Sequence, residues 1–352
     1  MDRALFQENE RLTPKADSRR FHQLGDFVCE SGAVIPSGQI AYETWGQLNA
    51  DKSNAILVCH ALSGDSHCLG WWSRLFGEDK PIDPEKWFII GTNALGGCQG
   101  STGPGTLDAN GLRLGSRFPQ VTVGDMVEAQ KSLASALGIT KLAMVCGGSM
   151  GGMQALEWTV RFPEMVERCW MTASCRAHSA MQIGFNEAAR QAILRDPAWN
   201  GGDYQNDKTP DNGLSVARMI GHLSYLSEDA FQQKFGREKQ VTGEEQFQVE
   251  SYLNYQGDKF THRFDAGSLV VLTKAIDSYC CESLAPAQCR YLFTSFNSDW
   301  LYPSHQSREL HELAQAAGKV SDWHDISLPY GHDAFLLDGI FQGDLVSGFL
   351  AS

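Results

Sequence analysis

The chain has 352 residues, of which 42% are hydrophobic and 20% are charged, and its formal net charge at pH 7 is −13. This length and composition exclude disorder, collagen and coiled coil, and they fit one large α/β domain with an insertion or two modest domains. Acidic and basic residues are intermixed and the net charge is acidic, so the sequence shows no cluster of basic residues that would bind nucleic acid or an anionic membrane surface. We therefore expect a protein that acts on small molecules.

The first 20 residues are charged from position 2 onward and lack the apolar core of a secretory signal. The longest apolar runs, such as 55–62, are far shorter than the roughly 20 residues that span a bilayer. The ten cysteines form no CxxC pair, and Cys59 and Cys146 lie in apolar, strand-like runs where a thiol packs as a small hydrophobe. We expect a cytoplasmic protein with reduced thiols.

Short apolar runs alternate with predicted helices through the first half of the chain. The apolar runs end in polar or glycine-rich loops, as buried parallel strands do. One intervening stretch has apolar residues at helical spacing and stops at Gly138, and another ends before Pro163. This alternation predicts a parallel sheet, with strands at 55–62, 86–95, 141–147 and 167–175 and helices at 123–138 and 150–162.

The pattern changes between about residues 176 and 270. The segments 180–194 and 214–226 read as amphipathic helices, and a polar loop separates them. We expect this region to be a helical insertion.

The first pattern then resumes, with a strand, a helix and a final strand expected at 289–297, 305–318 and 322–328. No internal repeat or low-complexity tract is visible in the sequence. The predicted domain plan is therefore an α/β core at 1–175 and 271–352, interrupted by a helical lid at 176–270.

Residues 147–151 read Gly-Gly-Ser-Met-Gly and fit the motif GxSxG, with an apolar strand before the motif and a helix after it. This is the context of a nucleophile elbow. The glycines permit a tight, strained turn that lifts the Ser149 hydroxyl above the strand ends and leaves the backbone N–H of Met150 free for an oxyanion. The alternative is a purely structural glycine-rich turn.

A serine hydroxyl is a weak nucleophile at neutral pH, so it needs a base and an orienting carboxylate, in the order Ser, Asp, His for this fold. His332 follows the last predicted strand, and Asp299 follows the strand before it. His332 would remove the Ser149 proton and later return it to the leaving group, while Asp299 would hold the imidazole tautomer. The competing residues are nine other histidines and two nearby aspartates, Asp322 and Asp325.

The second oxyanion donor is expected from the loop after the strand at 55–59, and we choose the N–H of Leu62. The alternative is a strand-to-loop turn with a buried leucine. The glycine-rich segment 96–105 does not match GxGxxG, and the sequence has no P-loop motif. Because no HExxH motif or Cys/His cluster is present either, we expect no metal.

At these residues the chain resembles the homoserine O-acyltransferase family of the α/β-hydrolases, and the likeness extends through most of the chain. The matching segments include IAYETWGQLNADKSNAILVCHALSGD at 40–65, NALGGCQGSTGP at 93–104, GGSMGGMQALEW at 147–158, VARMIGHLSYLS at 216–227, FQVESYLNYQGDKFTHRFDA at 247–266, SDWLYP at 298–303 and YGHDAFL at 330–336. The resemblance implies an α/β-hydrolase fold, with a mostly parallel sheet flanked by helices and an inserted helical lid. It also implies the catalytic residues Ser149, Asp299 and His332.

The resemblance further implies that Arg218 and Asp333 bind the amino-acid acceptor, with Tyr225 assisting. An α-amino acid presents a carboxylate and an ammonium, so one guanidinium and one carboxylate would clamp both ends. Without the resemblance, Arg218 reads as a solvated or ion-paired helix residue and Asp333 as a cap or loop-stabilising carboxylate. The sequence departs from the usual pattern of the family at 108–119 and at 174–187, and we expect the second segment to lie near the acceptor pocket.

In the implied reaction, acetyl-CoA acylates Ser149, CoA leaves, and the homoserine hydroxyl attacks the acyl-enzyme, which gives ping-pong kinetics in a step of methionine biosynthesis. Leu301 stands where succinyl-using relatives tend to carry an arginine, so acetyl is favoured over succinyl. Acetyl-CoA is then a substrate, and no permanently bound cofactor is expected.

Small molecules are the expected binding partners, and we expect a homodimer. The alternatives are a homoserine O-succinyltransferase, a short-chain ester hydrolase on the same scaffold that acts on compounds such as alkyl acetates, and a binding protein that keeps the fold without chemistry.

Overall fold

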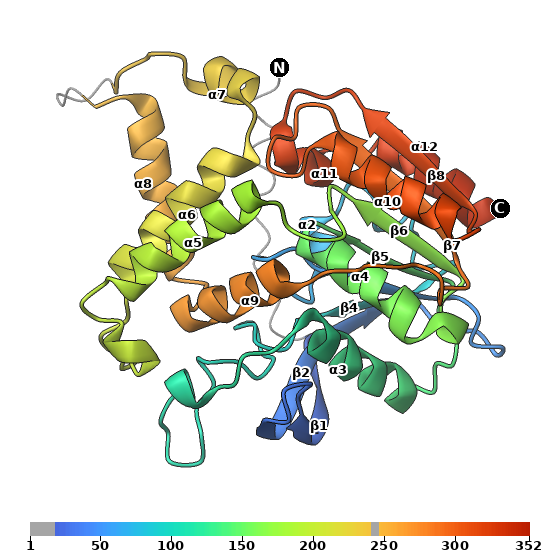
Figure 1. Ribbon diagram of the computed structural model, residues 1–352, viewed down its shortest axis with the longest axis horizontal. Helices are drawn as coiled ribbons and strands as arrows, with labels where there is room; N and C mark the ends of the chain where they lie inside the picture. Colours follow the sequence, from blue (N-terminus) through green and yellow to red (C-terminus); the bar gives the residue numbers. More distant parts are fainter. Residues whose placement is uncertain (1–17, 241–245) are drawn as a thin grey trace.

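The computed structural model describes residues 18–240 and 246–352, and its centre is one eight-stranded sheet (Figure 1). The strand order is β1-β2-β4-β3-β5-β6-β7-β8. Strands β3 to β8 pair in parallel, whereas β2 pairs antiparallel with both β1 and β4. The strands are β1 (Arg20–Val28), β2 (Val34–Trp45), β3 (Ala55–Cys59), β4 (Phe88–Thr92), β5 (Met144–Gly148), β6 (Arg168–Thr172), β7 (Arg290–Phe296) and β8 (Ser321–Ile326).

Helices cover both faces of the sheet. Alternate residues of β3 belong to two different apolar clusters, because successive side chains of a strand point to opposite faces. Leu57 belongs to the cluster that contains residues of α3, α4 and α10, whereas Ile56 belongs to the cluster that contains residues of α2, α11 and α12. The helices of this core are α2 (Cys68–Trp71), α3 (Val123–Ala136), α4 (Met150–Arg161), α10 (Ser304–Ala316), α11 (Ala334–Leu337) and α12 (Phe341–Ala351). The predicted mostly parallel sheet flanked by helices is confirmed.

The antiparallel hairpin of β1 and β2 is the part of the sheet that the sequence patterns do not predict. β1 is an edge strand with mostly exposed side chains, and its pairing with β2 shifts register on both sides of Gly25. An exposed edge strand needs no continuous apolar run, so the signal that identifies the inner strands is missing here.

Helices α5 to α9 form the connection between β6 and β7 and lie on one side of the sheet (Figure 1). They are α5 (Ala180–Leu194), α6 (Asp211–Tyr225), α7 (Glu228–Phe235), α8 (Gln248–Thr261) and α9 (Ala266–Ser278). The predicted lid ended at residue 270, which lies inside α9. Leu272 and Ala275 of that helix are fully buried and belong to the cluster that contains α3 and α4.

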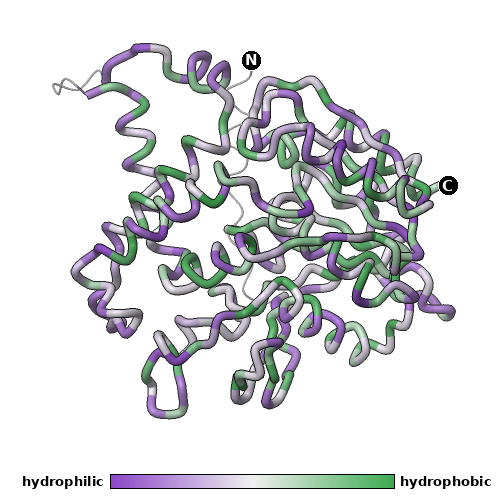
Figure 2. The backbone as a smooth tube through the Cα atoms, in the orientation of Figure 1, coloured by the Kyte–Doolittle hydropathy of each residue, from purple (hydrophilic) through white to green (hydrophobic). Residues whose placement is uncertain are grey.

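The hydropathy of the chain follows these layers. Hydrophobic stretches gather in the sheet and its covering helices, whereas the outer loops are largely hydrophilic (Figure 2). Within the described residues, no single helix has the length and apolar character to cross a membrane; only the bent pair Gly331–Leu337 and Phe341–Ala351 passes that test, and only as a pair.

Candidate functional site

Ser149 lies at the sharp turn between β5 and α4. Its φ of 55° and ψ of −126° are a conformation that residues with a side chain rarely adopt. The backbone N–H of Ser149 donates to the carbonyls of Thr172 and Ala173, both at 3.2 Å, and the Ser174 hydroxyl donates to the Ser149 carbonyl at 2.8 Å. These hydrogen bonds hold the strained residue in place. A strained serine at a sharp turn from a strand into a helix is the geometry of a nucleophile elbow.

The glycines around Ser149 allow backbones to approach closely. A Cβ atom on Gly151 would lie 2.0 Å from the carbonyl oxygen of Cys59, and one on Gly147 would lie 2.3 Å from the carbonyl carbon of Gly151. The obstructing atoms are backbone atoms of β3 and α4, which cannot rotate away. The elbow therefore needs glycine at both positions.

Gly151→Ala is expected to lower the free energy of unfolding by about 3 kcal/mol, because the added methyl group forces α4 away from β3. Thermal and urea unfolding measure this loss. Gly184→Ala is the matched control, since Gly184 is exposed in α5 and a Cβ there meets nothing within 4 Å. The control should raise stability by about 0.5–1 kcal/mol through helix propensity; equal effects of the two substitutions would contradict the close-approach argument.

His332 and Asp299 form a buried hydrogen-bonded pair beside this turn. His332 lies in the 3₁₀ turn Gly331–Asp333 after β8, and its Nδ1 is 2.7 Å from Asp299 Oδ2. The other carboxylate oxygen, Oδ1, accepts from the backbone N–H groups of Leu301 at 3.0 Å and Tyr302 at 2.8 Å. With Asp299 ionised, Nδ1 carries the proton and donates it to Oδ2, which leaves Nε2 as the acceptor.

The competing aspartates do not contact His332. Asp322 and Asp325 are exposed on β8, and Asp325 accepts from the hydroxyls of Ser295 at 2.9 Å and Ser304 at 2.6 Å. The structure therefore pairs Asp299 with the predicted base.

Tyr302 packs against the predicted base and lines the same cavity as the predicted nucleophile. Its ring stacks on the His332 ring, with centroids 4.8 Å apart and planes at 17°. Burial raises the pKa of Tyr302 well above its ordinary value, and the neighbouring Ser149 side chain opposes this effect. Among the hydrogen bonds of the described residues, none joins Ser149 to His332.

The two predicted oxyanion donors lie near Ser149. Met150 is the first residue of α4, so its N–H has no partner within the helix. Leu62 and Ser149 line the same small cavity of about 60 Å³. The loop that carries Leu62 is held by His60, whose Nε2 accepts from the Ala94 N–H at 2.9 Å while Nδ1 donates to the Ala61 carbonyl at 2.6 Å. The oxyanion roles themselves stay predictions.

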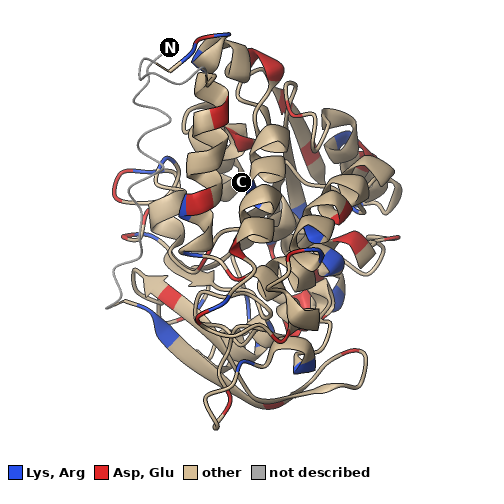
Figure 3. Cartoon of the chain, turned by 90° about the vertical axis from the view of Figure 1, so that its left-hand side faces the viewer, with Lys and Arg blue, Asp and Glu red and all other residues tan. Residues whose placement is uncertain are grey.

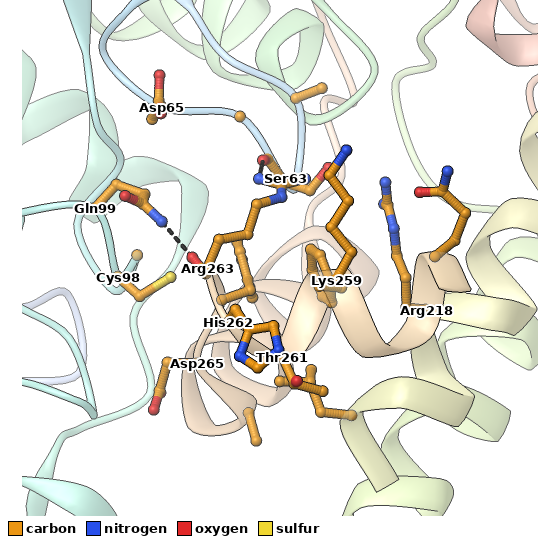
Figure 4. Close-up of a pocket in the computed structure, with 18 of the residues that line it drawn as sticks. Ser63, Asp65, Cys98, Gln99, Arg218, Lys259, Thr261, His262, Arg263 and Asp265 are labelled. Carbon is orange, nitrogen blue, oxygen red and sulfur yellow. Dashed lines mark hydrogen bonds between the residues drawn. The ribbon is translucent and has the colours of Figure 1, made fainter. Parts of the chain in front are cut away.

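A larger cavity of about 880 Å³ lies between the core and the lid. The predicted acceptor residues Arg218, Tyr225 and Asp333 all line it, and Arg218 and Tyr225 also line the small cavity that contains Ser149. Figure 4 shows Arg218, Lys259 and Arg263 on the lid side of this cavity and Ser63, Asp65 and Gln99 on the core side. The structure thus brings the predicted acceptor residues together at one cavity, next to the cavity that contains Ser149.

Arg218, Lys234 and Arg263 lie on the lid side of the larger cavity, whose lining also includes four aspartates. Acidic and basic residues are likewise intermixed over the lid surface (Figure 3). Burial, followed by the neighbouring Arg218, lowers the pKa of Arg263 to about 10. Burial and the charges of Arg218, Lys234 and Arg263 lower the pKa of His222 to about 2. Adjacent cations of this kind favour the binding of an anion.

Arg218 itself has an incomplete set of partners. Its guanidinium lies over the rings of Phe260 at 4.7 Å and Tyr225 at 5.7 Å, and its Nε is buried without a hydrogen-bond partner. An unsatisfied buried donor is unfavourable, so a bound carboxylate would complete the site. Burial raises the pKa of Asp333, with Asp299 acting in the same direction and His332 and Arg218 opposing them. A ligand ammonium would favour the ionised carboxylate.

Sequence reasoning missed Lys259, Arg263 and Tyr302. All three lie in segments that carried the family resemblance, 247–266 and 298–303, but no spacing rule gives the direction of a side chain in a lid helix or a loop. Arg263 also donates to the carbonyl of Ser63 at 3.0 Å, which ties the lid to the loop after β3. That contact joins residues 200 positions apart and has no local signal.

Comparison with known proteins agrees with the observed fold. Residues 54–338 match the family model described as alpha/beta hydrolase fold, which confirms the predicted fold class. A homoserine O-acetyltransferase from Solidesulfovibrio magneticus is 49% identical over an alignment that covers 92% of this chain and 89% of that protein.

Solved structures give the same likeness. The homoserine O-acetyltransferase from Bacillus anthracis matches with a TM-score of 0.88 and 28% identity, covering 95% of this chain and 97% of that one. The esterase E22 matches with a TM-score of 0.88 and 26% identity, covering 94% of this chain and 99% of that one. The chain is therefore similar to named acetyltransferases in sequence and fold, and to an esterase mainly in fold.

Proposed function

Because this chain belongs to the homoserine O-acetyltransferase family of the α/β-hydrolases, we propose that it is an enzyme that transfers an acetyl group to the hydroxyl of L-homoserine, a step of methionine biosynthesis. The observation that carries the proposal is the position of the elbow serine next to a cavity lined by Arg218 and Asp333. The serine supplies covalent chemistry, and the opposite charges suit an amino acid.

The proposed reaction has two halves. In the first, His332 Nε2 takes the Ser149 proton while Ser149 Oγ attacks the acetyl carbonyl of acetyl-CoA. The N–H groups of Leu62 and Met150 would bind the oxyanion, and CoA leaves as the thiol with the proton from His332. In the second half, His332 takes the proton of the homoserine hydroxyl, whose oxygen attacks the acyl-enzyme. The proton returns to Ser149 as O-acetylhomoserine leaves, so the kinetics should be ping-pong.

The acceptor would lie between Arg218 and Asp333. The Arg218 guanidinium can form a bidentate contact with the homoserine carboxylate. This contact would also give the buried Nε–H group of Arg218 a hydrogen-bond partner. Asp333 directly follows His332, so an ammonium bound there brings the rest of a short amino acid close to the base. Tyr225 supports the arrangement, because its ring lies 5.7 Å from the Arg218 guanidinium carbon and 6.0 Å from the His332 ring.

The donor is proposed to be acetyl-CoA, as a substrate. Lys259 and Arg263 line the larger cavity and give it the positive charge that a donor rich in phosphate requires. Leu301 lines the cavity of about 60 Å³ that contains Ser149, and a space of this size and an apolar wall suit a two-carbon acyl group better than succinyl.

We also propose a cytoplasmic location and a homodimer. The dimer is supported by exposed apolar side chains on three lid helices, which a second copy could cover. They are Met181 on α5, Val216 and Leu223 on α6, and Tyr255 on α8.

The direct test is mass spectrometry of the products after incubation with acetyl-CoA, with and without L-homoserine. Parallel reactions contain succinyl-CoA or ethyl acetate. O-acetylhomoserine that forms only with both substrates supports the transferase. Unmodified homoserine together with cleaved ethyl acetate would favour the second candidate, a short-chain ester hydrolase, to which the fold likeness to esterase E22 points.

Arg218→Ala is expected to lower kcat/KM for homoserine about 100-fold, because the substrate carboxylate loses a charged two-pronged partner in a buried site. Hydrolysis of a neutral acetyl ester should stay within about twofold, since the ester makes no ionic contact there. Initial rates for both substrates measure the split. Arg195→Ala, at an exposed arginine after α5, should leave both rates unchanged. Equal losses for ester and homoserine would contradict the acceptor role of Arg218.

A further inference from the structure

The side chain of His60 links the ends of two neighbouring strands. β3 and β4 pair in parallel, His60 directly follows β3, and Asn93 and Ala94 directly follow β4. The backbone N–H of Ala94 donates to His60 Nε2 at 2.9 Å, and Asn93 Nδ2 lies 3.2 Å from the same atom. His60 is only 2% exposed, and burial lowers its pKa. The imidazole is therefore neutral and bridges the two strand ends.

These contacts fix the position of the imidazole proton. A backbone N–H can only donate, so the hydrogen bond from Ala94 requires a lone pair on His60 Nε2. Asn93 fits this assignment, because its Oδ1 accepts from backbone N–H groups of the following loop, which leaves its NH2 group to face His60. The proton of the neutral ring is then on Nδ1, which donates to the Ala61 carbonyl at 2.6 Å.

The Ala61 carbonyl belongs to the same peptide group as the N–H of Leu62. The carbonyl also accepts from the N–H of Gly64 at 2.8 Å, so two donors hold it. The C=O and N–H of a trans peptide lie in one plane and point in opposite directions, so a fixed carbonyl fixes the N–H. Among the hydrogen bonds of the described residues, none uses the Leu62 N–H, and Leu62 and Ser149 line the same small cavity. This N–H is free to bind a group at the serine.

We propose that His60 is a positioning residue of the oxyanion site, which aims the Leu62 N–H at the oxyanion by holding the Ala61 carbonyl. The proposal rests on the proposed function in taking Ser149 as the nucleophile and Leu62 as an oxyanion donor. A donor on the carbonyl also polarises the peptide group, and linked hydrogen bonds strengthen one another. Because the oxyanion forms in both half-reactions, the loss of this contact should slow both.

Two amide substitutions separate the two hydrogen bonds of the imidazole. The NH2 group of His60→Asn lies near the position of Nδ1 and can donate to the Ala61 carbonyl, but the Ala94 N–H loses its acceptor. The amide of His60→Gln lies near the position of Nε2 and can accept from Ala94, but the Ala61 carbonyl loses its donor. Each variant loses one buried contact, so both should lower the melting temperature comparably.

The rate of Ser149 labelling by a fluorophosphonate, whose phosphoryl oxygen also needs the oxyanion donors, measures the effect on the site. The second-order rate should fall about 100-fold in His60→Gln and stay within about threefold of the wild type in His60→Asn. His311→Gln is the control, because His311 lies on α10 and its Nδ1 is 2.9 Å from the Ser321 hydroxyl. The control should label at the wild-type rate.

A trifluoromethyl ketone gives a second measurement on the same variants. Its carbonyl carbon bonds to Ser149 Oγ, the Ser149 proton passes to His332, and the carbonyl oxygen becomes the oxyanion. The affinity of this ketone, measured by its protection of Ser149 from labelling, should fall about 100-fold in His60→Gln and little in His60→Asn. Loss of affinity in step with the labelling rate assigns the effect to the oxyanion site.

The outcomes separate the two proposals. Equal labelling rates of His60→Asn and His60→Gln would overturn the positioning role, as would His60→Gln labelling within twofold of the wild type. A wild-type protein that the probe does not label at Ser149 would overturn the proposed nucleophile, and the role of His60 with it. The expected labelling pattern in a protein that leaves homoserine unmodified would overturn the proposed acceptor alone, and the role of His60 would stand.

Discussion

Ser149→Ala is expected to remove homoserine acetylation almost completely, with a fall in kcat of roughly 10⁴-fold to 10⁶-fold. The reason is that no acyl-enzyme can form, so the reaction loses the covalent route and keeps only substrate binding and the oxyanion donors. Release of free CoA measures the first half-reaction, and intact-protein mass spectrometry after mixing with acetyl-CoA detects the acyl-enzyme directly. The wild type should gain one acetyl group, and the variant none.

Two further variants make this result specific. Ser135→Ala changes an exposed serine of α3 and should keep full activity. Ser149→Cys restores a nucleophile at the same strained turn and should regain the acyl-enzyme, although not the full turnover. If the Ser149→Ala variant retained more than about 1% of the wild-type kcat, the nucleophile would be a residue other than Ser149.

The parts of the fold that the sequence predicted are those whose pattern is local. Every residue of β3 and of β5 is buried, so each reads as an apolar run, as a central parallel strand should. Helix α5 was expected at 180–194 and is found there, since Ser179 and Gln182 form a capping box at its start. The hairpin of β1 and β2 left no such run, because its edge strand is mostly exposed.

The residues of the site also differ in whether a local sequence signal identifies them. Ser149 sits in a contiguous motif, and Asp299 and His332 follow consecutive strands, so motif and chain order were enough to pair them. Tyr302 is different, because its ring stacks on that of His332 from another loop, and no motif gives the direction of its side chain. Contacts between side chains on separate elements depend on packing, and packing has no signature in a single sequence.

Asp299→Asn is expected to lower kcat about 10⁴-fold while the protein stays folded. The amide oxygen can still accept from the N–H groups of Leu301 and Tyr302, so the loop after β7 keeps its anchors. The amide nitrogen, however, faces His332 Nδ1 in place of Oδ2 and can only donate to it. The imidazole then carries its proton on Nε2, where it cannot accept a proton from Ser149.

The loss from Asp299→Asn should appear in both half-reactions, because His332 must accept a proton from Ser149 in one and from the homoserine hydroxyl in the other. CoA release and O-acetylhomoserine formation report them separately. Asp325→Asn is the control, since Asp325 is exposed and accepts only from Ser295 and Ser304 in the described residues. If Asp299→Asn kept more than about a tenth of the wild-type kcat, the tautomer argument would fail. The base would then be a histidine other than His332, or one that needs no carboxylate to orient it.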